Sequence, residues 1–116
     1  MDSSSNSFSA TLESLNGSAV VVLVGELDLN TAPVLEGTLD PLLDDGPPEV
    51  VIECSGLEFI DSSGIAILVR AQQRLQIRGG HLVVRSLKPH ALKIFETVGL
   101  IDYLGVETEV ADRQIS

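Results

Sequence analysis

The sequence predicts a single α/β domain with a mixed sheet of four to five strands, packed with three to four helices. The pair Asn16-Gly17 lies between two strand-like runs and is typical of a hairpin, so the domain is expected to open with two antiparallel strands. Strand-like runs then alternate with helical patterns of about 11 to 16 residues, which indicates parallel βαβ units. A chain of 116 residues is large enough for one core.

The expected strands differ in how their apolar residues are spaced. Residues 8–12 alternate as in a half-buried strand, whereas 19–24 and 50–54 are continuous apolar runs suited to strands buried on both faces. Residues 81–85 resemble a fourth strand, and 101–106 are a candidate fifth. The stretch 55–60 between the third strand and the next helix is expected to be a loop.

Three helices are predicted from capping residues and from apolar spacing. The first is capped by Asn30 or Thr31, carries Pro33 in its first turn and stops at Gly46-Pro47-Pro48. The second covers 63 to about 78 before Gly79-Gly80, and the third covers 88–98 before Gly99. The expected core faces are Leu35, Leu39, Leu42 and Leu43 on the first, Ile65, Leu68, Ala71 or Gln72 and Leu75 on the second, and Leu92 and Phe95 on the third.

The amino-acid composition disfavours several classes of function. The formal net charge is -10, from seventeen acids against seven bases, and it repels nucleic acid and anionic lipid. Three Phe, one Tyr and no Trp provide no platform for stacking bases. No signal sequence and no membrane span is visible, and the lone Cys54 can form no internal disulfide, so a reduced, cytoplasmic location is expected. Residues 1–7 are expected to be a flexible tail, and 8–116 the domain.

The stretch "FIDSSGIAILV" places Asp61, Ser62, Ser63 and Gly64 directly before an aliphatic helix. One interpretation is structural, because an Asp or Ser before a helix commonly caps its first turn. The other is functional, because a helix N-terminus also stabilises an anion. A phosphate on Ser62 would add a charge of about -1.5 to -2 beside Asp61, which is the layout of a switch.

Four segments, "GELDLNTAP", "VVIECSGLEFIDSSGIAILV", "GGHLVV" and "LKPHALKIFETVGL", occur in the order and spacing of STAS domains. The chain resembles a stand-alone anti-sigma-factor antagonist of bacterial partner-switching systems, over roughly residues 8–103. The resemblance implies that Ser62 is phosphorylated by an anti-sigma factor that is itself a serine kinase. It also implies a PP2C-type phosphatase, and a regulatory role of the kind found in stress response or sporulation.

The resemblance further implies a docking surface for the kinase. Glu26 and Asp28 match the family's acidic turn near the phosphorylated serine, and Ser63 then belongs to the helix start. Residues on the outer face of the following helix border this surface. The expected partner-binding residues are therefore Glu26, Asp28, Asp61, Ser62, Ser63, Gly64, Ala66, Arg70 and Ile77. The chain departs from the family in three places. Glu53 stands where the family usually has Asp, and Cys54 stands where Leu is common. The final segment "ETEVADRQIS" is short for the fourth helix that family members commonly have.

The sequence favours a binding module over an enzyme. A serine hydrolase needs a base and an acid around its nucleophile, whereas His81 and His90 are the only imidazoles and no Gly-x-Ser-x-Gly elbow is present. Asp28, Glu58 and Asp61 read as a solvated acidic loop, not as a Mg²⁺ site, and no metal or other cofactor is expected. Cys54 has no basic neighbour and is expected to be inert.

Two other functions stay open. The chain could be a STAS subunit of a lipid or anion transport assembly that binds an ATPase or permease without phosphorylation. An autonomous nucleotide-binding domain is disfavoured by the acidic charge. A homodimer is a further expectation, because Leu100, Ile101 and Leu104 would need a cover if the C-terminus forms no helix.

Overall fold

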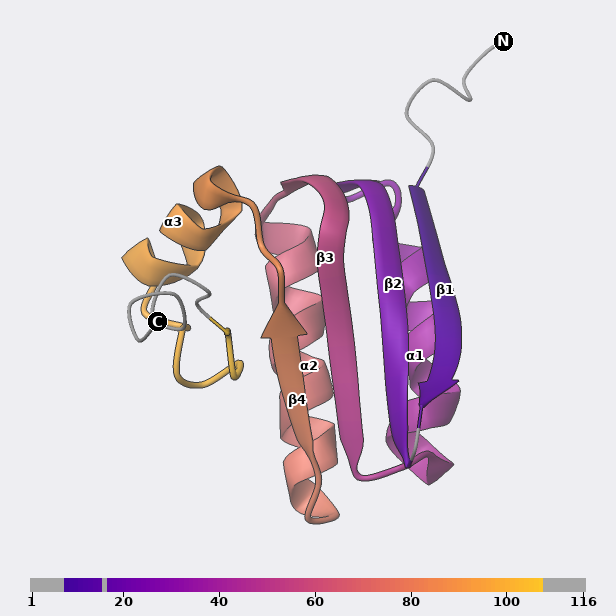
Figure 1. Cartoon of the computed structure of the whole chain (residues 1–116). Coiled ribbons are helices and arrows are strands. Elements are labelled where there is room, and N and C mark those ends of the chain that lie inside the picture. The colour runs from indigo at the N-terminus through magenta and orange to yellow at the C-terminus, as the bar shows by residue number, and fades with distance from the viewer. Residues whose placement is uncertain (1–7, 16, 108–116) are drawn as a thin grey trace, which may run out of the picture.

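The chain, seen in a computed structural model that describes residues 8–15 and 17–107, forms a mixed sheet with two helices on one face (Figure 1). The strands β1 (Phe8–Leu15), β2 (Ser18–Leu27), β3 (Glu49–Ile60) and β4 (His81–Arg85) lie in the order β1-β2-β3-β4. β1 pairs antiparallel with β2, and the remaining pairs are parallel. This confirms the predicted fold class, with four strands and three helices in the described residues. The expected tail at 1–7 lies outside them.

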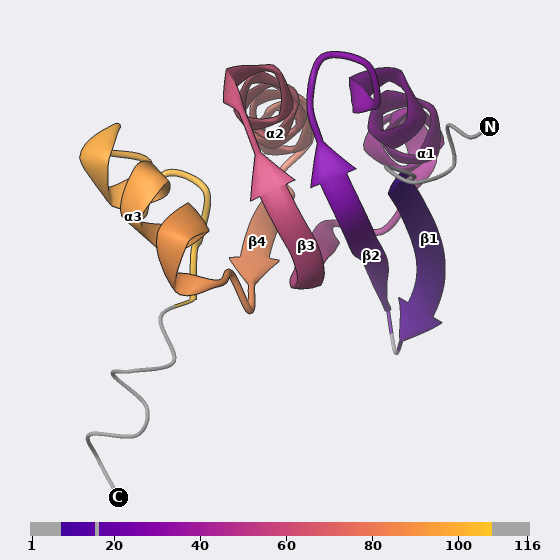
Figure 2. The ribbon, with the colours of Figure 1, turned by 90° about the horizontal axis from the view of Figure 1, so that it is seen from above.

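The helices α1 (Ala32–Asp45) and α2 (Ser62–Ile77) cover the same face of the sheet, and α3 (Pro89–Thr97) lies beyond β4 (Figure 2). Alternate side chains of β2 and β3 meet the two helices, because successive residues of a strand point to opposite faces. The leucines expected on α1 are all buried. On α2 the buried face is Gly64, Ile67, Leu68, Ala71, Gln72 and Leu75, so Ile65 lies at its margin.

Strand β3 is longer than the sequence indicates, and the prediction of a loop at 55–60 is wrong. The strand continues to Ile60, and within this segment Gly56, Leu57, Phe59 and Ile60 pair with β2. Its register against β2 shifts twice, between Val22 and Val24 and between Gly25 and Glu26. Each shift breaks the two-residue period by which a strand is recognised, yet both leave Leu57 and Ile60 in the core. The long strand delivers the chain directly to Asp61 and Ser62.

The prediction of a fifth strand at 101–106 is also wrong. The segment is a series of turns that makes one isolated bridge, between Val106 and Val84. Leu104 is fully buried within the chain, and Leu100 and Ile101 pack against the same core. These side chains therefore need no second copy of the chain to cover them. A fourth helix would fall in residues 108–116, which lie outside the described part of the chain.

The outer edge of β4 is filled by a side chain and a turn. Gln72 is buried on α2, and its Oε1 accepts a hydrogen bond of 2.9 Å from the Leu82 amide. Its Nε2 donates to the Tyr103 carbonyl at 2.7 Å and, at 3.5 Å, to that of Leu82. Two residues along, the Val84 amide donates to Gly105 and its carbonyl accepts from Glu107. The peptide groups of Leu82 and Val84 are thus satisfied without a fifth strand.

Arg78, directly after α2, holds the end of α1. Its Nε donates to the Leu43 carbonyl at 2.9 Å, and its Nη2 donates to the carbonyls of Leu42 (3.1 Å) and Gly46. The last carbonyls of a helix have no partner within the helix and carry partial negative charge. One guanidinium therefore satisfies several of them and links the ends of the two helices.

We expect Arg78→Ala to lower the free energy of unfolding by about 1–2 kcal/mol, because several carbonyls lose a charged donor. Arg78→Lys should recover only part of this loss, since an ammonium group lacks the planar fork of the guanidinium. Arg70→Ala is the control, because Arg70 makes an exposed ion pair that contributes little. Urea unfolding measures all three, and equal midpoints for Arg78→Ala and the natural protein would refute the capping role.

Candidate functional site

Ser62 lies at the junction between β3 and α2, in an exposed position. It is the first residue of α2, one residue earlier than predicted, and Asp61 is the N-cap. Asp61 Oδ1 accepts hydrogen bonds from the amides of Ser63 (2.8 Å) and Gly64 (3.4 Å). Among the residues that the structure describes, the Ser62 hydroxyl has no hydrogen-bond partner. The capping role therefore belongs to Asp61, and the Ser62 hydroxyl is free for other chemistry.

The acidic turn Glu26-Leu27-Asp28 lies beside this junction. Leu27 pairs with Ile60 at the end of the sheet, and its carbonyl accepts a hydrogen bond of 3.1 Å from the Asp61 amide. Within the turn, Asp28 Oδ1 accepts from the amides of Asn30 (2.9 Å) and Thr31 (3.1 Å). The turn and the phosphoacceptor candidate are thus held next to each other by backbone bonds.

The same end of the sheet is predominantly acidic. Glu58, four residues before Ser62, forms an ion pair of 3.2 Å with Lys88, and its carbonyl oxygen lies 2.9 Å from His90 Nε2. These contacts fasten the start of α3 to β3. In residues 8–15 and 17–107 no ion pair involves Glu26, Asp28 or Asp61. Asp28 and Asp61 accept hydrogen bonds from nearby amides, but within the described residues no basic side chain neutralises any of the three charges.

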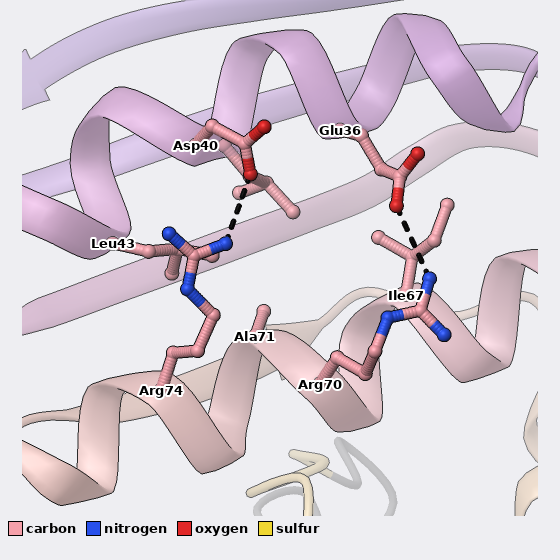
Figure 3. A pocket seen from close by; sticks show the side chains of 8 residues that line it. Glu36, Asp40, Leu43, Ile67, Arg70, Ala71 and Arg74 are labelled. Carbon is pink, nitrogen blue, oxygen red and sulfur yellow. Dashed lines mark hydrogen bonds and ion pairs between the residues drawn. The ribbon is translucent and has the colours of Figure 1, made fainter.

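The remaining predicted site residues lie at different places along α2. Gly64 is buried and Ala66 is half-buried. Arg70 points toward α1, where its Nη2 pairs with Glu36 at 3.1 Å across a shallow groove (Figure 3). Ile77 is 85% exposed but is the last residue of the helix, about 22 Å along its axis from Ser62.

The sequence predicts the group of residues around Ser62, but it does not predict the basic residues that contact acidic residues of β3 and α1. Lys88 and His90 lie about thirty residues from Glu58 in the chain, and only the order of the strands places them beside it. Arg74, which pairs with Asp40 (3.0 Å) and Asp44 (2.5 Å) across the same groove, was also missed. No local pattern signals either arrangement.

The reactive groups elsewhere in the molecule do not converge on Ser62. Cys54 is buried, and burial raises the pKa of its thiol to about 12, so it is protonated and unreactive near neutral pH. His81 lies 3.2 Å from Glu49 at the start of β4, the end of the sheet opposite to Ser62. The described residues contain no group of three or more His, Cys, Asp or Glu placed to hold a metal ion. Within the same residues, no helix is long and apolar enough to cross a bilayer.

The sequence is similar to a known domain family and to known proteins. The family model described as "Mlab, STAS domain" matches residues 10–106. The anti-sigma-B factor antagonist of Staphylococcus aureus is 31% identical over 88 residues, which cover 74% of this chain and 82% of that protein.

Two solved structures share the fold. The anti-sigma factor antagonist from Mycobacterium paratuberculosis superposes with a TM-score of 0.83 at 29% identity, covering 93% of this chain and 92% of the other. The phosphorylated form of the Bacillus cell fate determinant SpoIIAA has a TM-score of 0.69 at 22% identity, covering 93% of this chain and 100% of the other. At this lower identity the likeness concerns the fold alone.

Proposed function

Since the chain belongs to the STAS domain family, we propose that it is an anti-sigma-factor antagonist switched by phosphorylation of Ser62. In its unphosphorylated form it binds an anti-sigma factor that is a serine kinase, and this binding frees a sigma factor. Phosphorylation of Ser62 by that kinase ends the interaction. The chain is thus a substrate and a binding partner, not a catalyst.

The observation that carries this proposal is the exposed Ser62 at a helix N-terminus, whose hydroxyl makes no hydrogen bond within the part of the chain that the structure describes. Asp61 performs the capping, so the serine can be modified without loss of a bond that holds the helix. Ser63 is half-buried, which makes it the poorer substrate of the two. The positive end of the helix dipole also stabilises a phosphate at this position. Relatives and structural neighbours that bear the name of anti-sigma factor antagonists support the same function.

The proposed docking surface is built around the acidic turn and Ser62. Glu26, Asp28 and Asp61 supply charge that attracts a basic partner surface, and Ser62 and Ser63 lie between them and the exposed face of α2. Ala66, Arg70 and Ile77 extend this surface along the helix. A PP2C-type phosphatase restores the hydroxyl, and all of these partners act in the cytoplasm.

We expect the kinase of the source organism, incubated with ATP, to phosphorylate Ser62 and leave Ser63 unmodified. The exposed Ser62 can enter a kinase active site, whereas Ser63 would need the first helical turn to open. Phosphopeptide mapping of the natural protein and of Ser62→Ala and Ser63→Ala variants measures this. Phosphate on Ser63 would refute the assignment.

A pull-down from native lysate separates this function from a transport role. An anti-sigma-factor kinase captured by the natural protein supports the proposal. A transporter ATPase or a permease captured in its place, with no phosphate on Ser62 after incubation with ATP, would overturn it.

A further inference from the structure

Gly64, in the first turn of α2, lies in direct contact with Leu27 of the acidic turn. A Cβ atom added to Gly64 would lie 2.6 Å from Leu27 Cγ and 2.7 Å from Leu27 Cδ2. A third contact, with Ile60 Cγ1, would be 3.0 Å. Real Cβ atoms do not approach carbon this closely, so glycine alone lets the helix rest on Leu27 at this distance.

Leu27 is held firmly enough to act as a support. Its side chain is fully buried, its backbone pairs with Ile60, and its carbonyl accepts the Asp61 amide. The exposed Glu26 and the half-buried Asp28 flank it in the chain. A shift of the Leu27 backbone would therefore carry the neighbouring residues Glu26 and Asp28 with it.

Gly64 is linked to Ser62 through Asp61, the N-cap of α2. Asp61 Oδ1 binds the amides of Ser63 and Gly64 together, so these residues move with the cap as one turn of helix. The height of this turn above the sheet is set by the contact between Gly64 and Leu27. A side chain at residue 64 would lift the turn and shift the Ser62 hydroxyl away from the acidic turn.

We propose that Leu27 and Gly64 are positioning residues, whose contact fixes the Ser62 hydroxyl relative to Glu26 and Asp28. The inference rests on the proposed function for its consequence. In the transfer, the Ser62 oxygen forms a bond to the γ-phosphorus of ATP, the bond from that phosphorus to the bridging oxygen breaks, ADP leaves and the hydroxyl proton is released. A kinase that grips the acidic turn delivers the γ-phosphorus to a fixed place, and a displaced hydroxyl reacts slowly there.

The test compares the effect of Gly64→Ala in the natural protein with its effect in a Leu27→Ala background. Gly64→Ala alone should slow phosphorylation of Ser62 by the kinase and ATP at least tenfold. In a Leu27→Ala background the two shortest contacts are absent and only the one with Ile60 Cγ1 remains, so Gly64→Ala should then have a much smaller effect on the rate. This difference distinguishes the contact from a general loss of structure, and it can be measured even if the single Gly64→Ala variant folds poorly. A Gly64→Ala effect of equal size in both backgrounds would overturn the proposal.

A second measurement does not need the kinase. In Gly64→Ala, the backbone amide signals of Glu26 and Asp28 in a ¹H–¹⁵N spectrum should shift together with those of Ser62 and Ser63. The double variant should return them toward the Leu27→Ala values. Shifts confined to residues near 64 would overturn the proposed link. If the natural protein is not phosphorylated at Ser62, the proposed function fails while these spectra still decide the contact.

Gly37→Ala is the matched control. Gly37 lies in α1, and an added Cβ there meets nothing within 4 Å. Because alanine is a better helix former than glycine, this change should leave the phosphorylation rate and the Ser62 signals unchanged and raise the urea midpoint slightly. A slower rate in Gly37→Ala would overturn the proposal, because the effect would then follow from any Gly→Ala change in a helix.

Discussion

Replacing Ser62 by glutamate is expected to weaken binding of the anti-sigma-factor kinase by about a hundredfold or more, whereas Ser62→Ala binds as the natural protein does. Two like charges about 4 Å apart repel by about 4 kcal/mol at an effective dielectric constant of 20. Solvent screening and the helix dipole lower this repulsion, and about 3 kcal/mol corresponds to a hundredfold change in affinity. Titration calorimetry of the three proteins with the kinase measures the effect.

Both variants should remain folded. An acid in the first turn of α2 interacts favourably with the helix dipole, and Asp61 still caps the helix in each protein. Urea midpoints that match the natural protein establish this. Equal affinity of Ser62→Ala and Ser62→Glu for the kinase would show that the stretch around Ser62 is only a helix start. Because Ser62→Ala cannot be phosphorylated, its complex should also resist release by ATP.

Replacing Gln72 by leucine is expected to lower the free energy of unfolding by about 3–5 kcal/mol. The substitution keeps the size of the side chain but removes the partners of the Leu82 amide and of the Tyr103 carbonyl, and it weakens the bonding of the Leu82 carbonyl. Each buried polar group left without a partner costs about 1–3 kcal/mol. The loss is a large part of the stability of a domain this size, which is about 5–15 kcal/mol.

Gln73→Leu is the matched control, because Gln73 is the next residue of α2 and is exposed. Its free energy of unfolding should change by no more than about 0.5 kcal/mol. Urea unfolding followed by circular dichroism compares the variants. If Gln72→Leu unfolds within 0.5 kcal/mol of the control, then the amide of Gln72 does not hold the edge of β4 as the structure indicates.

The elements that the sequence predicted well are those defined by local chemistry. The hairpin before Ser18, the apolar run of β2 and the proline near the start of α1 each act within a few residues. The sequence predicts a shorter β3 than the structure shows, because the two register shifts depend on the pairing with β2. They leave no regular alternation of apolar and polar residues by which the end of the strand could be recognised. The segment 101–106 was predicted as a strand because its apolar residues suit one, yet it packs as a turn against α2 and β4.

The candidate site was predicted as far as short motifs reach. Asp61 and Ser62 are neighbours in the chain, and the resemblance to STAS domains linked them to Glu26 and Asp28. The contact between Leu27 and Gly64 was not predicted, because a glycine before an aliphatic helix reads equally well as a simple turn. The partners of Glu58 and Arg78 were also missed, since these contacts join residues about thirty positions apart.

The side chain of Gln72 occupies hydrogen-bonding groups at the β4 edge of the sheet, so a further strand cannot pair there without displacing it. A bare edge strand is a template on which another molecule can add a strand, and such pairing leads to domain swapping and to fibrils. On β4 the outward peptide groups of Leu82 and Val84 are already occupied, by the Gln72 amide and by Gly105 and Glu107. Under the proposed function, the chain exchanges partners at its Ser62 end while the occupied β4 edge prevents copies of the chain from pairing through added strands.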